Sequence, residues 1–466
     1  MMSEKTQIAV IGAGFSGVVT AVHLLRAGRS VILINRSGRM ARGVAYGTNA
    51  AAHVLNVPAG RMSAFPDDEE SFLRFARERD ATVDGGSFVS RSAYGEYLDH
   101  TLMEAEQTAP GGARLERIVG HVADIGLPAG GSRAFVTLAD GPRIDVDRVV
   151  LALGNFAPAD PAVDDRRFYS SARYIRDPWA PGALDSVVPD DSVFLIGTGL
   201  TMYDMILELD ERGVHQPMYA ISRRGLTAQP HRLQGQPPTY EDFPGDLDGA
   251  AASVLTYLQA VRSKIAAHSA AGGDWRDVIA SLRPATPALW NALSEAERAR
   301  FVRHVLPFWD VHRHRAAPSA ASAAAQLMRD GRLVVAAGRI LGFEETPSGV
   351  SVSWRPRGKE RTTRREFTRV INCTGPATNL AAAGEPLVDK LIERGVLTTD
   401  ALRLGVRVTP DGALIGADGN ASNAIFYVGP LLKAQYWEAT AVPELRVHAA
   451  RLAAHLRDSL ESTGNH

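Results

Sequence analysis

Residues 8–17 read IAVIGAGFSG, an apolar run that leads into three glycines spaced as GxGxxG: Gly12, Gly14 and Gly17. Apolar periodicity predicts a strand, a helix and a second strand between residues 7 and 34, which together make a βαβ unit. The first glycine permits the tight turn, the second lets backbone approach a pyrophosphate, and the third lets the helix pack against the strand. The helix start offers unpaired N–H groups to phosphates. This context predicts dinucleotide binding, and the alternative is a glycine-rich structural turn.

The second strand of this unit ends in Asn35 and Arg36, where an Asp or Glu usually accepts a hydrogen bond from the ribose. The carbonyl oxygen of an asparagine can accept one such bond, without the strength that a charge gives. An arginine at this place can instead indicate a 2′-phosphate. The first site is therefore expected to hold either FAD, with weakened ribose contacts, or NADP.

A second βαβ unit follows later in the chain, and its turn reads GTGLTM. Gly197 and Gly199 are in place, whereas Met202 stands where the third glycine would be, which loosens only the approach of helix to strand. The next strand leads into Arg223 and Arg224. Two guanidiniums suit the 2′-phosphate of NADPH, because each can present paired donors to phosphate oxygens. The alternative is a solvated basic turn.

Composition excludes several classes of protein. The chain has 466 residues, 51 basic and 52 acidic side chains, 45% hydrophobic residues and one cysteine, Cys373. This length allows about three domain-sized units. The absence of a basic excess argues against a nucleic-acid partner, and one cysteine cannot form an internal disulfide or a cysteine-based zinc cage. No run of about 20 apolar residues predicts a membrane span. We expect a soluble, cytoplasmic protein.

The two βαβ units divide the chain. We expect an FAD-binding domain from residues 1–158 and 371–466, and an NADPH-binding domain from residues 159–370. Residues 230–330 are mostly helical and amphipathic, with breaks at proline and glycine pairs and at Pro307, and are expected to form a helical insertion. The expected fold class is α/β, with two Rossmann-like domains of three ββα layers each.

Longer strings resemble a known group. GVAYGT, HVLNVPAGRMS, WDVHRHRAAP and WEATAVPELR are similar to a bacterial FAD/NAD(P)-binding family of two-dinucleotide-binding-domain flavoproteins, related to the flavin-dependent N-hydroxylating monooxygenases. LALG at 151–154 and INCTGP at 371–376 resemble the segments by which such proteins leave and re-enter the FAD domain. YVGP at 427–430 resembles their last FAD-contacting element, although Pro430 replaces the usual acidic residue.

The resemblance implies FAD and NADPH as cofactors. The final helix, expected to begin near Trp437 and Glu438, would point its N-terminus at the flavin. The residues implied at the first dinucleotide and its flavin are Gly12, Gly14, Phe15, Ser16, Gly17, Asn35, Arg36, Asn56, Met62, Gly154, Gly375, Gly429 and Trp437. Those implied at NADPH are Gly197, Gly199, Leu200, Thr201, Arg223 and Arg224.

The cysteine count also limits the reaction. Disulfide reductases of this architecture need a cysteine pair, and Cys373 is alone. The Baeyer–Villiger fingerprint FxGxxxHxxxW is not in register after residue 156. An N-hydroxylating oxygenase needs little acid–base chemistry from its side chains, because its flavin cofactor carries the reactive oxygen. We predict a single-component monooxygenase that hydroxylates a small polar nitrogen-containing molecule with O₂. The alternatives are a flavoprotein reductase that passes electrons to a quinone or a partner protein, and a non-catalytic nucleotide sensor.

The insertion is the expected wall of the substrate pocket, and FWDVHRHRAAP holds most of the candidates. Arg313 or Arg315 could clamp a substrate carboxylate, and His312 or His314 could transfer a proton near neutral pH. The alternative is a polar helix end whose charges pair at a domain interface. The expected catalytic set is Asn56, Arg61, His312 and Arg313. No metal is expected. His304, His312 and His314 could be read as a metal site, but no nearby carboxylate pattern or cysteine completes it.

Overall fold

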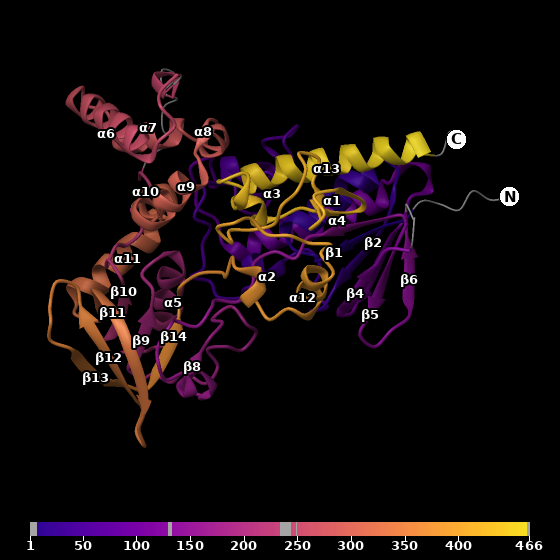
Figure 1. Cartoon of the computed structure of the whole chain (residues 1–466). Coiled ribbons are helices and arrows are strands. Elements are labelled where there is room, and N and C mark those ends of the chain that lie inside the picture. Colours follow the sequence, from indigo (N-terminus) through magenta and orange to yellow (C-terminus); the bar gives the residue numbers. More distant parts are fainter. Residues whose placement is uncertain (1–6, 129–132, 234–243, 248, 464–466) are drawn as a thin grey trace.

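The computed structural model describes residues 7–128, 133–233, 244–247 and 249–463 (Figure 1). Two α/β units lie side by side, and a group of helices rises from the second one. The long C-terminal helix runs along the first unit. The sheet of the first unit combines strands from the early part of the chain with two strands from its late part.

The first unit has three layers around a six-stranded sheet. Its strands are parallel except for the first in this order: β15 (Ala413–Ile415), β16 (Ala421–Tyr427), β7 (Arg148–Leu151), β1 (Gln7–Ile11), β2 (Ser30–Asn35) and β3 (Leu115–Val119). One face packs on α1 (Phe15–Arg26), α4 (Arg91–Gln107) and α13 (Val442–Thr463). The other packs on α12 (Pro386–Glu393) and on the antiparallel sheet β4 (Val122–Gly126), β5 (Ala134–Leu138) and β6 (Arg143–Val146).

Short elements connect β2 to α4 in this unit. They are α2 (Gly43–Tyr46), the 3-10 turn η1 (Ala59–Arg61) and α3 (Ser71–Arg79). Ser90 caps α4 by accepting a hydrogen bond from the amide of Ala93. The loop that contains η1 faces the second unit, so it carries side chains to the junction.

The second unit is built on a seven-stranded sheet. The strands are, in order, β13 (Thr363–Phe367), β12 (Val350–Pro356), β11 (Leu333–Glu345), β10 (Met218–Ser222), β9 (Val193–Ile196), β14 (Arg369–Asn372) and β8 (Tyr174–Ile175). Helices α5 (Leu200–Glu211) and α11 (Pro318–Arg329) cover one face, and an aromatic cluster around the 3-10 turn η3 (Arg167–Ser170) covers the other. Both dinucleotide-type βαβ units of the sequence are thus present.

The C-terminal boundary of the second unit differs from the prediction. The expected boundary between residues 370 and 371 falls inside β14, which pairs in parallel with β9 and β8. Cys373 follows this strand, donates its amide to the carbonyl of Ile196 at 2.8 Å and packs in the core under α5. It therefore belongs to the second unit, because the parallel pairing with β9 continues up to it.

The chain passes between the units twice, and the two passages run together. Phe156 on the outward passage forms an antiparallel bridge with Ala377 on the return. The side-chain amide of Asn372 donates to the carbonyl oxygen of Ala159 at 3.0 Å. A paired connection of this kind limits how the two units can rotate against each other.

The helical insertion is shorter than residues 230–330. It contains α6 (Val254–Ala270), α7 (Trp275–Ser281), α8 (Thr286–Ala292), α9 (Glu295–Arg300), a π-helical turn (Phe301–Val305) and α10 (Leu306–Arg313). The predicted break at Gly272–Gly273 separates α6 from α7, whereas the one at Pro237–Pro238 lies outside the described residues. Pro307 begins α10 instead of breaking a helix, which suits its missing N–H. Helix α11 packs on α5 and β11, so it belongs to the second unit.

The final helix begins at Val442 and not near Trp437 and Glu438, so that prediction was wrong. A 3-10 turn (Pro430–Ala434) and further turns precede it. Pro443 gives the physical reason. In a helix that started five residues earlier, this proline would stand in the interior, where it lacks an N–H and clashes with the preceding turn. At the second position of α13 it costs nothing.

The first glycine turn tolerates no side chain at its third glycine. A Cβ built on Gly17 would lie 1.9 Å from the carbonyl oxygen of Gly12, whereas one built on Gly14 meets nothing closer than 3.7 Å. We expect Gly17→Ala to lower the free energy of unfolding by about 3 kcal/mol, through forced separation of α1 from β1. Gly14→Ala is the matched control, with an expected loss below about 1 kcal/mol. Urea unfolding of the two variants measures the difference, and equal losses would refute the close-approach argument.

Candidate functional site

The two glycine turns have the same construction. A Cβ on Gly12 would lie 2.2 Å from the carbonyl oxygen of Ala152, and one on Gly197 would lie 2.5 Å from that of Cys373. Both glycines have positive φ, 104° and 110°. In each unit, the strand before the turn pairs with a neighbouring strand, β7 or β14. The residue that follows this neighbouring strand lies directly against the turn glycine. Only glycine fits at either position.

Each turn leads into a helix whose first amides are available. Helices α1 and α5 begin after Gly14 and Gly199, and neither helix start has a side-chain cap. Nothing lies within 4 Å of a Cβ built on Gly199. The side chain of Phe15 is buried beside Tyr94, so this residue and Ser16 offer their backbone N–H groups. Uncapped helix starts behind glycine turns are suited to bind phosphate.

The two units also have equivalent glycines after the strands that lie beside the glycine turns. Gly154 follows β7 and Gly375 follows β14, with φ of 70° and 83°, and a Cβ on either would have no neighbour within 4 Å. Gly429, after β16, has φ of 147°. Leu200 and Thr201 are half-buried at the start of α5. The structure thus places the implied glycines at the carboxyl ends of the parallel strands, where ligands bind in such sheets.

The segment GVAYGT packs on the first turn, a contact that no pattern in the sequence predicted. A Cβ on Gly43 would lie only 2.9 Å from Cα of Gly14, and Gly43 has a φ of 57°. Helix α2 begins at this glycine. Any side chain here would push α2 away from the turn, so the two segments form one surface.

Asn35 and Arg36 have different surroundings at the end of β2. The side-chain amide of Asn35 donates to the hydroxyl of Ser37 at 2.9 Å and to the carbonyl of Arg39 at 2.8 Å, which leaves its carbonyl oxygen as an available acceptor. Arg36 forms an ion pair with Glu385 at 3.0 Å. Its guanidinium therefore already has a carboxylate partner.

The corresponding arginines of the second unit are available. Arg223 is exposed, and Arg224 lies over the ring of Phe308 on α10, with 5.3 Å between the guanidinium carbon and the ring centre. Within the described part of the chain, neither forms an ion pair with a carboxylate. Ser222 accepts a hydrogen bond from Thr198 at 2.8 Å, which ties the end of β10 to the second glycine turn.

The loop between α2 and α3 contacts the second unit. His53 is buried and lies 2.7 Å from the hydroxyl of Thr48 and 3.3 Å from the carboxylate of Glu208 on α5. The Nε2 atom of His231 lies 2.9 Å from the carbonyl oxygen of Asn56. Burial, followed by the charge of Arg315, lowers the pKa of His231 to about 4. His231 is therefore neutral at pH 7.

Two ion pairs fasten the insertion to the C-terminal part of the first unit. Arg313 on α10 lies 2.9 Å from Glu438, and their side chains are 11% and 2% exposed. Trp309 donates its indole N–H to the same carboxylate at 3.2 Å. Arg283, between α7 and α8, pairs with Glu444 at the start of α13. Glu438 and Glu444 lie in the string WEATAVPELR, but no sequence signal singled out Arg283.

The expected catalytic set is divided in the structure. Burial, together with the nearby guanidiniums of Arg283 and Arg313, lowers the pKa of Arg61, so Arg61 and Arg313 share one region. The imidazole of His312 turns toward α7, where it meets the ring of Trp275 edge-on at 5.0 Å. In the part of the chain that the structure describes, no hydrogen bond, ion pair or ring contact joins His312 to Asn56, Arg61 or Arg313.

Three other candidate residues, His314, Trp437 and Met62, lie among packed side chains. Burial and the charge of Arg313 lower the pKa of His314 to about 3, so it is neutral at physiological pH. Trp437 packs on Trp290 at 4.4 Å and on Phe301 at 5.1 Å between ring centres, within the core of the insertion. Met62 is buried in the first unit's core. Trp437 therefore holds the insertion in place, and this packing does not support its expected contact with a cofactor.

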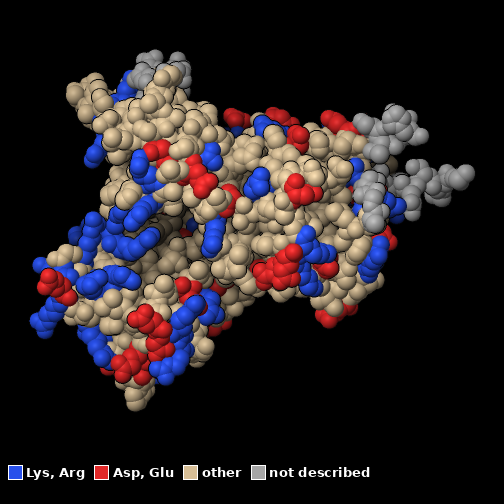
Figure 2. Space-filling view, in the orientation of Figure 1, with Lys and Arg blue, Asp and Glu red and all other residues tan. Residues whose placement is uncertain are grey.

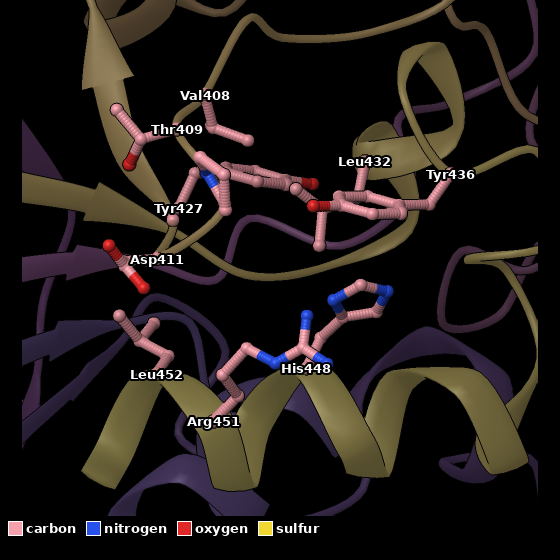
Figure 3. Close-up of a pocket in the computed structure, with 11 residues that line it drawn as sticks. Val408, Thr409, Asp411, Tyr427, Leu432, Tyr436, His448, Arg451 and Leu452 are labelled. Carbon is pink, nitrogen blue, oxygen red and sulfur yellow. The ribbon is translucent and has the colours of Figure 1, made fainter. Parts of the chain in front are cut away.

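A small cavity lies between α13, the loop of residues 408–412, the end of β16 and the turn that holds Leu432 and Tyr436 (Figure 3). His448 and Arg451 on α13 point toward Tyr427 and Tyr436 across it. Its volume is about 10 Å³, room for about one water molecule. An organic substrate does not fit there. Within the described residues, no three His, Cys, Asp or Glu side chains gather as a metal site, and no helix is long and apolar enough to cross a bilayer.

The lowered pKa of His231 predicts acid sensitivity. Its folded-state pKa of about 4 lies below the unfolded value of about 6.5, so its contribution to stability is present above pH 6.5 and is lost as the pH falls. The loss is at most about 1.4 kcal/mol per pH unit, reduced by partial solvent screening. We expect His231→Gln to lose less stability than the wild type between pH 7 and pH 5 in urea unfolding. His121→Gln, at an exposed position, is the control, and identical slopes for all three proteins would refute the assignment.

Comparison with known proteins supports this description of the fold. Residues 9–156 match the family model described as FAD-NAD(P)-binding. A search of the curated proteins found no match. Among solved structures, the ornithine hydroxylase of Pseudomonas aeruginosa is 15% identical with a TM-score of 0.65, over 98% of this chain and 100% of that one.

Two further solved structures are similar over the whole chain. The L-lysine 6-monooxygenase of Pseudomonas syringae is 17% identical with a TM-score of 0.64, over 98% of this chain and 100% of that one. The cadaverine monooxygenase of Erwinia amylovora, solved with FAD, is 12% identical with a TM-score of 0.64, over 97% and 94%. This protein therefore carries an FAD-NAD(P)-binding domain and has the fold of the two-dinucleotide-binding-domain flavoproteins.

Proposed function

We propose that the protein is an FAD- and NADPH-dependent monooxygenase that hydroxylates an amine nitrogen of a small molecule with O₂. The observation that carries this proposal is the extent of the structural likeness. The likeness to N-hydroxylating enzymes extends over 97–98% of this chain, which has two glycine turns and an insertion after the second turn, at TM-scores of 0.64–0.65. The single cysteine, buried under α5, supports it further because a disulfide relay needs two.

The residues at the first turn fit FAD. The amides at the start of α1 would bind the pyrophosphate, and the free carbonyl oxygen of Asn35 would accept a ribose hydroxyl. Because Arg36 is paired with Glu385, it is not free for a 2′-phosphate, which favours FAD over NADP at this site. When bound and reduced, the flavin supplies the electrons that activate O₂.

The residues at the second turn fit NADPH. The start of α5 would bind the pyrophosphate, and Arg223 and Arg224 would bind the 2′-phosphate. Phe308 on α10 of the insertion contacts Arg224, so this part of the insertion would lie close to NADPH held by that arginine. The insertion excludes water and orients the amine, while neutral His231 holds the carbonyl of Asn56.

The central test is product formation. Purified protein reconstituted with FAD is incubated with NADPH and a panel of amines and amino acids, while NADPH oxidation, O₂ uptake and hydroxylamine are measured. We expect one or more compounds to give hydroxylamine in proportion to the NADPH consumed. Rapid reduction of artificial acceptors without any hydroxylated product would favour the reductase alternative, and failure to bind FAD would favour the sensor.

A second test addresses the assignment of Arg223 and Arg224. Replacing both with alanine should raise the KM for NADPH by at least about 10-fold, since even one charge-assisted hydrogen bond to the 2′-phosphate contributes about 1.5–3 kcal/mol. The KM for NADH, which has no 2′-phosphate, should change little. Arg339→Ala, at an exposed position on β11, is the control. Equal effects of the double substitution on both nucleotides would overturn the assignment.

A further inference from the structure

Arg315 is a buried guanidinium without a partner. It lies between α10 and α11, where its neighbour Ala316 bridges Pro230, and it is 6% exposed. In the part of the chain that the structure describes, its side chain makes no ion pair and no hydrogen bond. Of its three side-chain nitrogens only Nε is both fully enclosed and unsatisfied, so the two terminal nitrogens are the part that reaches accessible space.

The other arginines around it are neutralised. Arg232 lies 2.6 Å from Asp277, and Arg276 lies 3.0 Å from Asp274. Arg313 has Glu438, as described above. Arg315 is therefore the surplus positive charge of this cluster. Burial and the charges of Arg313, Arg276 and Arg232 lower its pKa to about 10, against a smaller opposing effect of Asp274, which is itself paired with Arg276. Arg315 is still charged at pH 7.

An unpaired buried charge is costly, and proteins place such costs at functional sites. The penalty for a desolvated ion amounts to several kcal/mol unless an opposite charge joins it. Nothing in the surrounding packing needs a guanidinium here, because the neighbouring carboxylates already have partners. The charge becomes favourable only when an anionic group binds to it.

The position of Arg315 selects the anionic group. Its charge acts on His231, which contacts the carbonyl of Asn56 in the loop expected beside the flavin ring. The nucleotide phosphates have their own donors at the two glycine turns and at Arg223 and Arg224. Figure 2 shows Lys and Arg side chains on the α11 side of a hollow that faces the first unit, with Asp and Glu side chains on its upper rim.

We propose that Arg315 binds the carboxylate of the molecule on which the enzyme acts, so that the substrate is an amino acid and not a simple diamine. The identity of this substrate rests on the proposed function, whereas binding of a carboxylate at Arg315 does not. The planar guanidinium can donate two parallel hydrogen bonds to the carboxylate and fix its orientation. This holds the amine of the same molecule at a set distance from the reacting centre.

L-lysine and cadaverine differ only in the carboxylate and make a matched pair of probes, with L-ornithine and putrescine as a second pair. Thermal shift and calorimetric titration are measured on the FAD-loaded protein without NADPH, so that no turnover occurs. We expect at least one amino acid to raise the Tm of the wild type, and its diamine to do so much less. Arg315→Met should weaken binding of that amino acid about 100-fold, and Arg315→Lys about 10-fold.

The unliganded Arg315→Met protein separates a binding role from a structural one. Removing a surplus buried charge should leave its Tm unchanged or higher, whereas removing a structural ion pair would lower it. Arg339→Met controls for loss of a positive charge. The proposal is overturned if neither amino acid shifts the wild-type Tm, if Arg315→Met binds them as well as the wild type, or if its main effect is weaker binding of NADPH. A protein that binds amino acids through Arg315 but forms no hydroxylamine would overturn the proposed function alone.

Discussion

The buried pair of Arg313 and Glu438 is the contact on which the architecture of the junction depends. It joins the last helix of the insertion to the segment that leads into α13, and it is supported by the indole of Trp309. Breaking such a pair on one side typically costs about 3–5 kcal/mol, because the remaining charge stays buried. Moving the insertion away would require this free energy. The pair therefore holds one wall of the candidate site in place.

This pairing also determines which arginine of the segment has no carboxylate partner among the described residues. The sequence WDVHRHRAAP offers two guanidiniums two residues apart, and either one is chemically able to bind a carboxylate. In the folded protein Arg313 is used for structure and Arg315 is not. An unpaired buried positive charge lowers the stability of the folded protein, and a bound anion would remove that cost. A binding site of this kind gains affinity at the expense of stability.

The glycine turns of the two dinucleotide-type units are constrained sterically and not by charge. In each unit a turn glycine lies against a backbone carbonyl of the neighbouring strand, Gly12 against Ala152 and Gly197 against Cys373. The same strands then lead into the paired passages at Phe156 and Ala377. The turns that face the cofactors and the connection between the units are therefore parts of one continuous backbone structure. Displacement of one unit against the other is transmitted directly to both turns.

Local pattern determined much of this protein. The GxGxxG spacing, the apolar strands and the arginine pair after β10 specify both βαβ units, because these features depend on neighbours within about 30 residues of the chain. The predicted beginning of α13 was wrong although a local residue, Pro443, decides it. The place of Cys373 was wrong because its strand pairs with β9, which lies far away along the chain. The partners of Arg36, Arg313 and Arg283 come from residues more than 100 positions away. Charge pairing across such distances is set by tertiary packing, so only the folded structure separates the arginine that holds the protein together from the one left free to bind.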